Sequence, residues 1–154
     1  MNKGKPLNVW MFAGLLAVAA FTLPPTHALA GDMLMYKSPN CGCCSSWADT
    51  LKAAGFTVAE NKDEDMDVIK AKYGVSEKLA SCHTAIIDGY VIEGHVPAAD
   101  VQRLLKEKPE GVVGLTAPGM PQQSPGMQPD VLEPKNYDVL AFDKDGKTTV
   151  FSHY

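Results

Sequence analysis

The pattern of apolar and polar positions in the first half of the chain alternates between short runs typical of strands and repeats typical of helices. The clearest repeat places Trp47, Leu51 and Ala54 at helical spacing just before Gly55, a common helix stop. The predicted elements in chain order are a strand at Met33–Tyr36, a helix at Ser45–Ala54, a strand at Phe56–Ala59 and a short helix at Val68–Tyr73. This part of the chain therefore has the order β-α-β-α.

Two further strand-like runs flank an Asp-Gly pair. Residues 84–87 and 90–93 are rich in β-branched and apolar residues, and Asp88-Gly89 between them is a strong hairpin signal. Proline then opens a predicted helix over 97–106. The full order β-α-β-α-β-β-α is that of a thioredoxin-like sandwich, so we predict an α/β fold of this kind.

The composition changes after the predicted third helix. Residues 111–134 are rich in Gly, Pro, Gln and Met and have no periodicity, which predicts an ordered loop or a linker. Residues 137–142 and 148–151, on either side of Asp145-Gly146, predict a final hairpin. This last part of the chain is thus expected to be an extension of the main domain.

The N-terminus has the features of an export signal. Lys3 and Lys5 precede an apolar run at 9–23, and the Ala-Leu-Ala sequence at 28–30 is the small-residue pattern cut by signal peptidase. A retained membrane anchor is the alternative, but the run is shorter than the ~20 residues that a spanning helix needs. The expected division is a signal peptide at 1–30, a thioredoxin-like domain at 31–110 and an extension at 111–154.

The net charge of the mature chain limits the partners that we expect for it. Removing residues 1–30 takes away two lysines and no acid, which leaves 12 basic and 18 acidic residues in the mature chain. A mildly acidic chain without a basic run gives no reason to expect nucleic acid or an anionic membrane as a partner.

The length of 154 residues suits one domain with a core, but is short for two.

The sequence Cys41-Gly42-Cys43-Cys44 lies between the first predicted strand and the first predicted helix. A C-x-x-C frame at a helix start is a redox or metal-binding device, because the free N–H groups and the helix dipole favour thiolate over thiol. Cys41 and Cys44 are therefore the candidate catalytic pair. Cys43 adds a third thiol, more than one disulfide can use, and such a cluster suits a soft ion that shares sulfur bridges. Cu(I) is the expected ion outside the cytosol.

Cys82-His83 precedes the third predicted strand, in a loop that faces the redox motif in thioredoxin-like folds. We therefore expect both residues to lie close to Cys41 and Cys44. The alternative is a disulfide between Cys82 and one member of the cluster, because disulfides are the default for an even number of cysteines in an exported chain. Such a bridge would leave an odd pair of reactive thiols, so we favour metal binding.

Met120 and Met127 lie in two near-copies of a Pro-Gly-Met sequence, in a polar segment without a helical or strand face that could bury them. Thioethers are soft ligands for Cu(I), so both methionines are candidate copper ligands. Packing as apolar plugs, or no role within a linker, is the alternative. His95, just before the predicted third helix, is interpreted as a capping or surface residue. His153, near the end of the chain, is a still weaker candidate for a metal ligand.

Three segments together resemble one known family. They are Tyr36–Cys44 with its C-x-C-C core, Ser81–Ala85, and Gly89–Pro97 with its Gly-His-Val-Pro end. The sequence resembles the CopG group of bacterial copper-resistance proteins over essentially the whole mature chain. The resemblance implies a periplasmic protein of a Gram-negative bacterium, with a thioredoxin-like domain and a C-terminal metal-binding extension.

The resemblance also implies a multicopper site bridged by cysteine sulfur and a role in interconverting Cu(I) and Cu(II). By motif, Cys41, Cys43 and Cys44 are the implied cluster ligands. The remaining candidate metal ligands are Cys82, His83, Met120 and Met127. The expected protein is a monomer whose partners are copper ions and components of copper efflux.

Other functions and other metals stay open on the sequence. A metal-independent thiol–disulfide oxidoreductase would use Cys41 as attacking thiol and Cys44 as resolving thiol, although the aromatic residue usual before such a motif is missing. A passive copper chaperone or store is a third possibility. Zinc also suits Cys and His ligands, but methionine is not a zinc ligand. An iron–sulfur cluster is less expected outside the cytosol.

Overall fold

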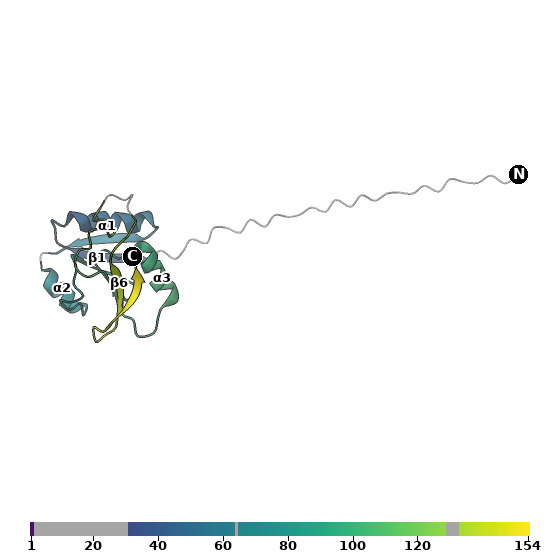
Figure 1. Cartoon of the computed structure of the whole chain (residues 1–154). Helices are drawn as coiled ribbons and strands as arrows, with labels where there is room; N and C mark the ends of the chain where they lie inside the picture. The colour runs from purple at the N-terminus through teal and green to yellow at the C-terminus, as the bar shows by residue number, and fades with distance from the viewer. Residues whose placement is uncertain (2–30, 64, 129–132) are drawn as a thin grey trace.

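The computed structural model describes residue 1 and residues 31–63, 65–128 and 133–154 of the chain. The predicted signal peptide lies outside the described residues. Within them, three helices pack against the two faces of one seven-stranded sheet (Figure 1). None of these helices is long and apolar enough to cross a membrane.

The element bounds agree closely with the sequence pattern. The helices are α1 (Gly42–Ala53), α2 (Met66–Lys72) and α3 (Ala98–Glu107). The strands are β1 (Asp32–Lys37), β2 (Thr57–Lys62), β3 (His83–Ile87), β4 (Tyr90–Glu93), β5 (Gly114–Thr116), β6 (Asp138–Phe142) and β7 (Thr148–His153). Helix α1 starts three residues earlier than predicted, which places Cys43 and Cys44 in its first turn.

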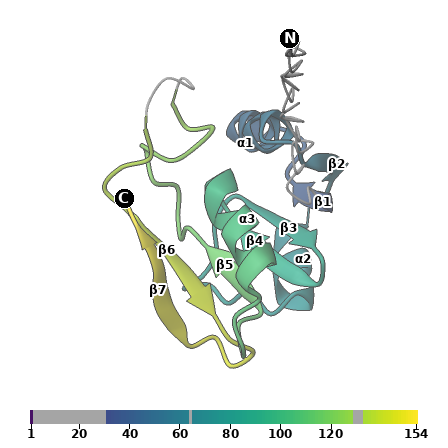
Figure 2. The same ribbon diagram turned by 90° about the vertical axis from the view of Figure 1, so that its right-hand side faces the viewer.

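The strand order β2-β1-β3-β4 confirms the predicted thioredoxin-like arrangement. Strands β1 and β2 are parallel, and β3 runs antiparallel to both β1 and β4. Strands β5, β6 and β7 continue the same sheet beyond β4 (Figure 2). The structure thus adds three strands of the C-terminal extension to the edge of the four-stranded core.

The two faces of the sheet carry separate cores. Helices α1 and α3 cover one face, where Trp47 and Leu104 pack with the strand residues Met35, Ala85 and Ile92. A smaller cluster on the other face contains residues of β4 and β6 together with those that follow α2. Alternate residues of one strand point to opposite faces, which is why the buried strand residues divide between the two cores.

The predicted central and C-terminal hairpins are both present. Asp88 and Gly89 have φ of +48° and +82°, the left-handed values that a two-residue hairpin turn requires at both central positions. This turn fixes the β3–β4 register, in which Thr84 is paired with Glu93. The C-terminal hairpin consists of β6 and β7, joined in antiparallel register.

The prediction of a loop or linker across 111–134 is wrong at β5. This strand has only three residues, all buried, and pairs with β4 on one side and β6 on the other. Successive side chains of a strand point to opposite faces of the sheet, so three consecutive buried residues mean that both faces of β5 are covered and that it shows no apolar–polar alternation. Its short length left no periodic signal in the sequence.

Candidate metal site

The cysteine motif occupies the junction between β1 and α1. Cys41 is the N-cap of α1, and its side chain does not cap the helix. The first turn of α1 contains Cys43 and Cys44 and no acidic residue. The free N–H groups and the positive end of the helix dipole therefore face cysteine sulfur rather than a carboxylate, which favours sulfur anions there.

Cys41 and Cys44 form a disulfide across the C-x-x-C frame, with their Cα atoms 5.4 Å apart. Cys43 and Cys82 are free thiols. The alternative expectation of a disulfide between Cys82 and the cluster is therefore wrong. The C-x-x-C frame at a helix start already holds its two sulfurs within bonding reach, whereas Cys82 is on another element, where its thiol stays free and its carbonyl oxygen lies 3.8 Å from Cys44 Sγ.

The structure nevertheless brings all four sulfur atoms together. The Sγ atoms of Cys41, Cys43, Cys44 and Cys82 all lie within 4.8 Å of one another. Cys41 Sγ and Cys43 Sγ are 3.6 Å apart. Three of the four cysteines are only half-buried, and Cys44 is buried. Reduction of the disulfide would thus leave four adjacent thiols, of which three are partly open to solvent.

Two imidazole rings lie beside Cys82. Its Sγ is 2.9 Å from His95 Nε2 and 3.4 Å from His83 Nδ1. The ligand atoms of Cys82, His83 and His95 all lie within 4.8 Å of one another, so Cys82 belongs to a sulfur cluster and to an imidazole cluster at once. Both rings are fully buried.

The tautomer of His95 is fixed by its second nitrogen. Nδ1 is 2.6 Å from the carbonyl oxygen of Pro125, and since a carbonyl only accepts, Nδ1 carries the proton and donates it. Nε2 then has a lone pair that faces the Cys82 sulfur. A carbonyl acceptor on one nitrogen and a free lone pair on the other is the arrangement found in metal-binding histidines.

His83 lies between Trp47 and His95. Its ring centroid is 4.3 Å from that of Trp47 and 5.2 Å from that of His95. Its Nε2 atom is buried without a hydrogen-bond partner among the described residues. A buried polar atom without a partner costs free energy, so this ring has an unused capacity for a ligand or a hydrogen bond at the site.

Burial keeps the side chains of Cys82, His83 and His95 neutral. It raises the pKa of the Cys82 thiol to about 12, with the neighbouring Cys43 adding to the shift. It lowers the pKa of His83 well below its ordinary value and also lowers the pKa of His95, against the effect of the Pro125 carbonyl. The Cys82 thiol therefore donates to a neutral His95. A cation that replaces this proton would be bound by a sulfur anion and neutral imidazole nitrogen.

The first part of the segment between β5 and β6, residues 117–128, is attached to the site. The carbonyl of Pro125 accepts from His95, and a Cβ on Gly126 would collide with the backbone of Trp47 and approach the carbonyl oxygen of Cys43. Gly119 N donates to Ala80 O over 2.9 Å, so the segment is also attached next to Cys82. Figure 2 shows this segment beside α1.

The two predicted methionine ligands belong to this segment. Met120 follows Gly119 and is 54% exposed, while Met127 follows Gly126 and is half-buried. The backbone on the N-terminal side of each methionine is thus attached next to a cysteine of the cluster. Their roles as ligands stay predictions.

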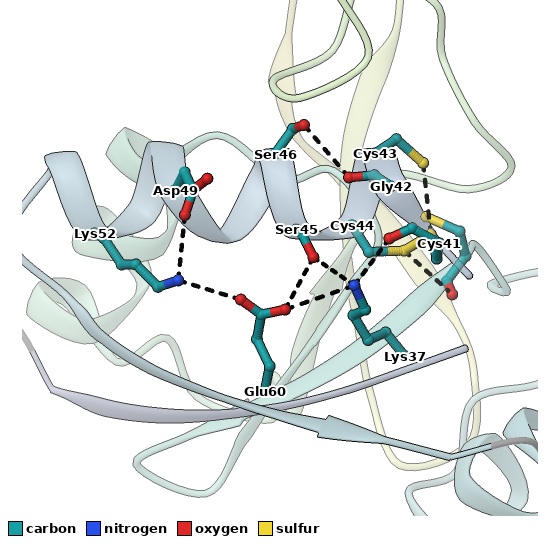
Figure 3. A network of polar contacts seen from close by, with 11 residues as sticks. Lys37, Cys41, Gly42, Cys43, Cys44, Ser45, Ser46, Asp49, Lys52 and Glu60 are labelled. Carbon is teal, nitrogen blue, oxygen red and sulfur yellow. Dashed lines mark hydrogen bonds and ion pairs between the residues drawn. A yellow bond between two sulfur atoms is a disulfide. The ribbon is translucent and has the colours of Figure 1, made fainter. Parts of the chain in front are cut away.

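A polar network supports the cysteine motif from the sheet side (Figure 3). Lys37 is almost fully buried at the end of β1, and its Nζ donates to Cys41 O over 2.9 Å and to Ser45 Oγ. Its charge is balanced by Glu60, 3.6 Å away, which also accepts from Ser45 and pairs with Lys52. Partial burial acts to raise the pKa of Glu60, but these hydrogen bonds and lysine charges outweigh it and lower the pKa overall. The network fixes the turn that presents the cysteines.

His95 is the site residue that the sequence interpretation misplaced. It was expected to cap a helix or lie at the surface, but it is fully buried against Cys82. The signal that could have located it is the predicted hairpin. With Asp88-Gly89 as the turn, continuing the strand register beyond the Thr84–Glu93 pair places Cys82 opposite His95.

The fold and the site together define a thioredoxin-like protein with a cysteine and histidine cluster suited to a soft metal ion. A family model described as "Protein of unknown function, DUF411" matches residues 79–127. No curated protein matches the chain.

Two solved structures are similar to this chain. They are titled copper resistance protein CopG, form 1 and form 2, and each is 38% identical with a TM-score of 0.73. The match covers 81% of this chain for form 1 and 80% for form 2, and 98% of the other chain in both cases. The chain belongs to the CopG family of copper resistance proteins.

Proposed function

We propose that the protein binds copper ions in the periplasm as part of copper resistance, and that it interconverts Cu(I) and Cu(II). The single observation that carries the proposal is the convergence of four cysteine sulfurs and two imidazoles around Cys82. The titles of the two similar structures support copper as the ion, and the features of an export signal in the sequence support the compartment.

The donor set is suited to Cu(I). Cysteine thiolates are soft ligands that can bridge two ions, and neutral imidazole is a good borderline ligand for copper. Cys41, Cys43, Cys44 and Cys82 would supply the sulfurs, while His83 and His95 would supply nitrogen. Met120 and Met127 would complete the donor set from the segment between β5 and β6. The copper ion is here the substrate, and components of copper efflux are its proposed recipients.

The Cys41–Cys44 pair gives the site a store of two electrons. Two Cu(II) ions and the two thiolates of this pair yield two Cu(I) ions and the disulfide, so the electrons balance without another reactant. A small dithiol donor would restore the thiolates by exchange. The disulfide observed between Cys41 and Cys44 supports this use of the pair, because it is the oxidised product.

The test is anaerobic loading of the reduced protein with Cu(I), followed by metal analysis and absorption spectroscopy. The proposal predicts several coppers per chain, a reversible spectral change on oxidation, and a lower stoichiometry in Cys43→Ser. Cys43 is the cysteine to replace in this test, because it lies outside the disulfide and its loss leaves the Cys41–Cys44 pair intact. Copper retained without any change of oxidation state would reduce the function to passive storage or delivery.

A metal-independent thiol–disulfide oxidoreductase is the second candidate. The same disulfide, in a C-x-x-C frame at a helix start of a thioredoxin-like fold, favours it. This function requires Cys41 and Cys44 but not Cys43, Cys82 or the histidines. Turnover of a disulfide substrate by copper-free protein, unchanged in Cys43→Ser, would select it over the copper function.

A further inference from the structure

Glu93 is a fully buried carboxylate that lies two residues before His95. Its Oε1 accepts from Lys70 Nζ over 2.5 Å and from the backbone N–H of Ser81 over 2.6 Å. Its Oε2 accepts from Thr84 Oγ1 over 2.6 Å. Through these contacts the carboxylate of Glu93 connects β4 to α2, to β3 and to the residues just before β3.

Ser81 is the residue through which Glu93 reaches the site. It immediately precedes Cys82, so the position of its backbone sets where the Cys82 side chain begins. Its hydroxyl donates to the carbonyl oxygen of Gly119, the residue before Met120. Both Cys82 and the start of the methionine-bearing segment are thus attached to a residue held by Glu93.

Stability alone is a poor explanation for this ion pair. Moving two charges out of water costs several kcal/mol per ion, and apolar residues of similar volume are often as stabilising as a buried pair. Burial accordingly raises the pKa of Glu93, against the opposing effect of Lys70. What an apolar pair could not supply is an acceptor for the Ser81 N–H.

We propose that Glu93 is a positioning residue of the metal site, because its carboxylate holds Ser81 and thereby places Cys82 and the segment that carries Met120. The part of this inference that concerns Cu(I) affinity rests on the proposed function. The effect of Glu93 on the position of Cys82 does not depend on that function, and it can be measured in copper-free protein.

A second buried carboxylate provides a control. Asp100 in α3 accepts from Ser152 over 2.5 Å and from Tyr154 over 2.9 Å, and pairs with Arg103 over 3.3 Å. These contacts attach the C-terminal strand to α3 and include none of the candidate ligands. Asp100→Asn therefore reports what loss of a buried carboxylate does to the fold in general.

The decisive experiment compares two double variants. Lys70→Met with Glu93→Gln removes both charges but keeps an amide oxygen that accepts from Ser81. Lys70→Met with Glu93→Leu removes the same charges and also the acceptor. The readouts are the alkylation rate of Cys82 relative to Cys43 in reduced, copper-free protein, and the affinity for Cu(I) added alone.

The Gln variant should keep both readouts near wild type, as should Asp100→Asn. The Leu variant should raise the relative alkylation rate of Cys82 about tenfold and weaken Cu(I) binding about tenfold, the scale set by one unpaired buried donor. If the Leu variant does not fold, Glu93→Asp keeps the charge pair but is too short to reach Ser81, and should show the same direction. Equal readouts for the Gln and Leu variants would overturn the inference. If wild type binds no Cu(I) but the alkylation contrast appears, positioning stands and only the proposed function fails.

Discussion

Cys82 Sγ lies 2.9 Å from His95 Nε2, across the open end of the β3–β4 hairpin. The two residues are thirteen positions apart in the chain and meet because a two-residue turn sets the register of the strands between them. His95 in turn binds the Pro125 carbonyl, so this one contact also connects the hairpin to the segment between β5 and β6. The hairpin therefore organises the half of the site that lies opposite the C-x-C-C motif.

Replacement of His95 by alanine should weaken Cu(I) binding about 10- to 100-fold, since loss of one contact to a charged group is typically worth about 1.5–3 kcal/mol and each 1.4 kcal/mol is tenfold. Competition with a chromophoric Cu(I) chelator measures the affinity. His153→Ala is the matched control, because His153 is an exposed histidine whose contact is with Asp138. Equal affinities for the two variants would exclude His95 from the site.

Acid should destabilise the reduced, copper-free protein. Burial lowers the pKa of His83 and of His95 in the folded chain, whereas the unfolded chain binds protons near the ordinary histidine value of about 6.5. Below that pH the unfolded state holds more protons, so the free energy of unfolding falls as pH falls, by up to about 1.4 kcal/mol per pH unit for each histidine.

Urea denaturation between about pH 7.5 and pH 5.5 measures this slope across the ordinary histidine pKa. His83→Gln should have a smaller slope than wild type, whatever its absolute stability. A wild-type stability that stays constant or rises as the pH falls through this range would contradict the assignment of two neutral buried histidines.

Gly126 and Gly146 form a matched pair for testing how the segment between β5 and β6 is held. Both have positive φ, +83° and +74°, so alanine at either position costs about 1–2 kcal/mol of backbone strain. Only at Gly126 would the added Cβ collide with the backbone of Trp47, while the space around Gly146 is open. Gly126→Ala should therefore lower the free energy of unfolding by about 1–3 kcal/mol more than Gly146→Ala. Equal losses in chemical denaturation would mean that the segment does not pack on α1.

Lys37 and Lys52 both pair with Glu60 but differ in burial. The side chain of Lys37 is 4% exposed and that of Lys52 is 42% exposed. Lys37→Met leaves the Cys41 carbonyl and Ser45 without their buried donor, and should cost about 1–3 kcal/mol of unfolding free energy. Lys52→Met breaks exposed pairs and should cost less than about 1 kcal/mol. Urea denaturation of both variants tests the difference, and a larger loss for Lys52→Met would refute it.

The sequence was sufficient for the thioredoxin-like core because each element had its own local signal. Helical spacing marked α1, and Asp88-Gly89 marked the hairpin. The C-x-x-C frame was recognisable because its sulfurs are close along the chain. Local patterns of this kind need no knowledge of how distant segments meet.

The parts that were missed depend on distant contacts. His95 lies in the Gly-His-Val-Pro sequence, but its burial arises from the hairpin register and from the Pro125 carbonyl, which that sequence does not encode. Strand β5 forms because β4 and β6 are both available as neighbours, not because of a preference within its three residues. The attachment of the methionine-bearing segment likewise depends on Ser81 and on the backbone of α1, which its own sequence does not encode.

The most direct test of copper binding at the cysteine and histidine cluster is X-ray absorption at the copper edge on protein loaded anaerobically with Cu(I). The account predicts a first shell dominated by sulfur, with additional scattering from imidazole that is reduced in His95→Ala and unchanged in His153→Ala. A first shell of oxygen and nitrogen alone, or a sulfur shell unaffected by Cys43→Ser and Cys82→Ser together, would contradict it.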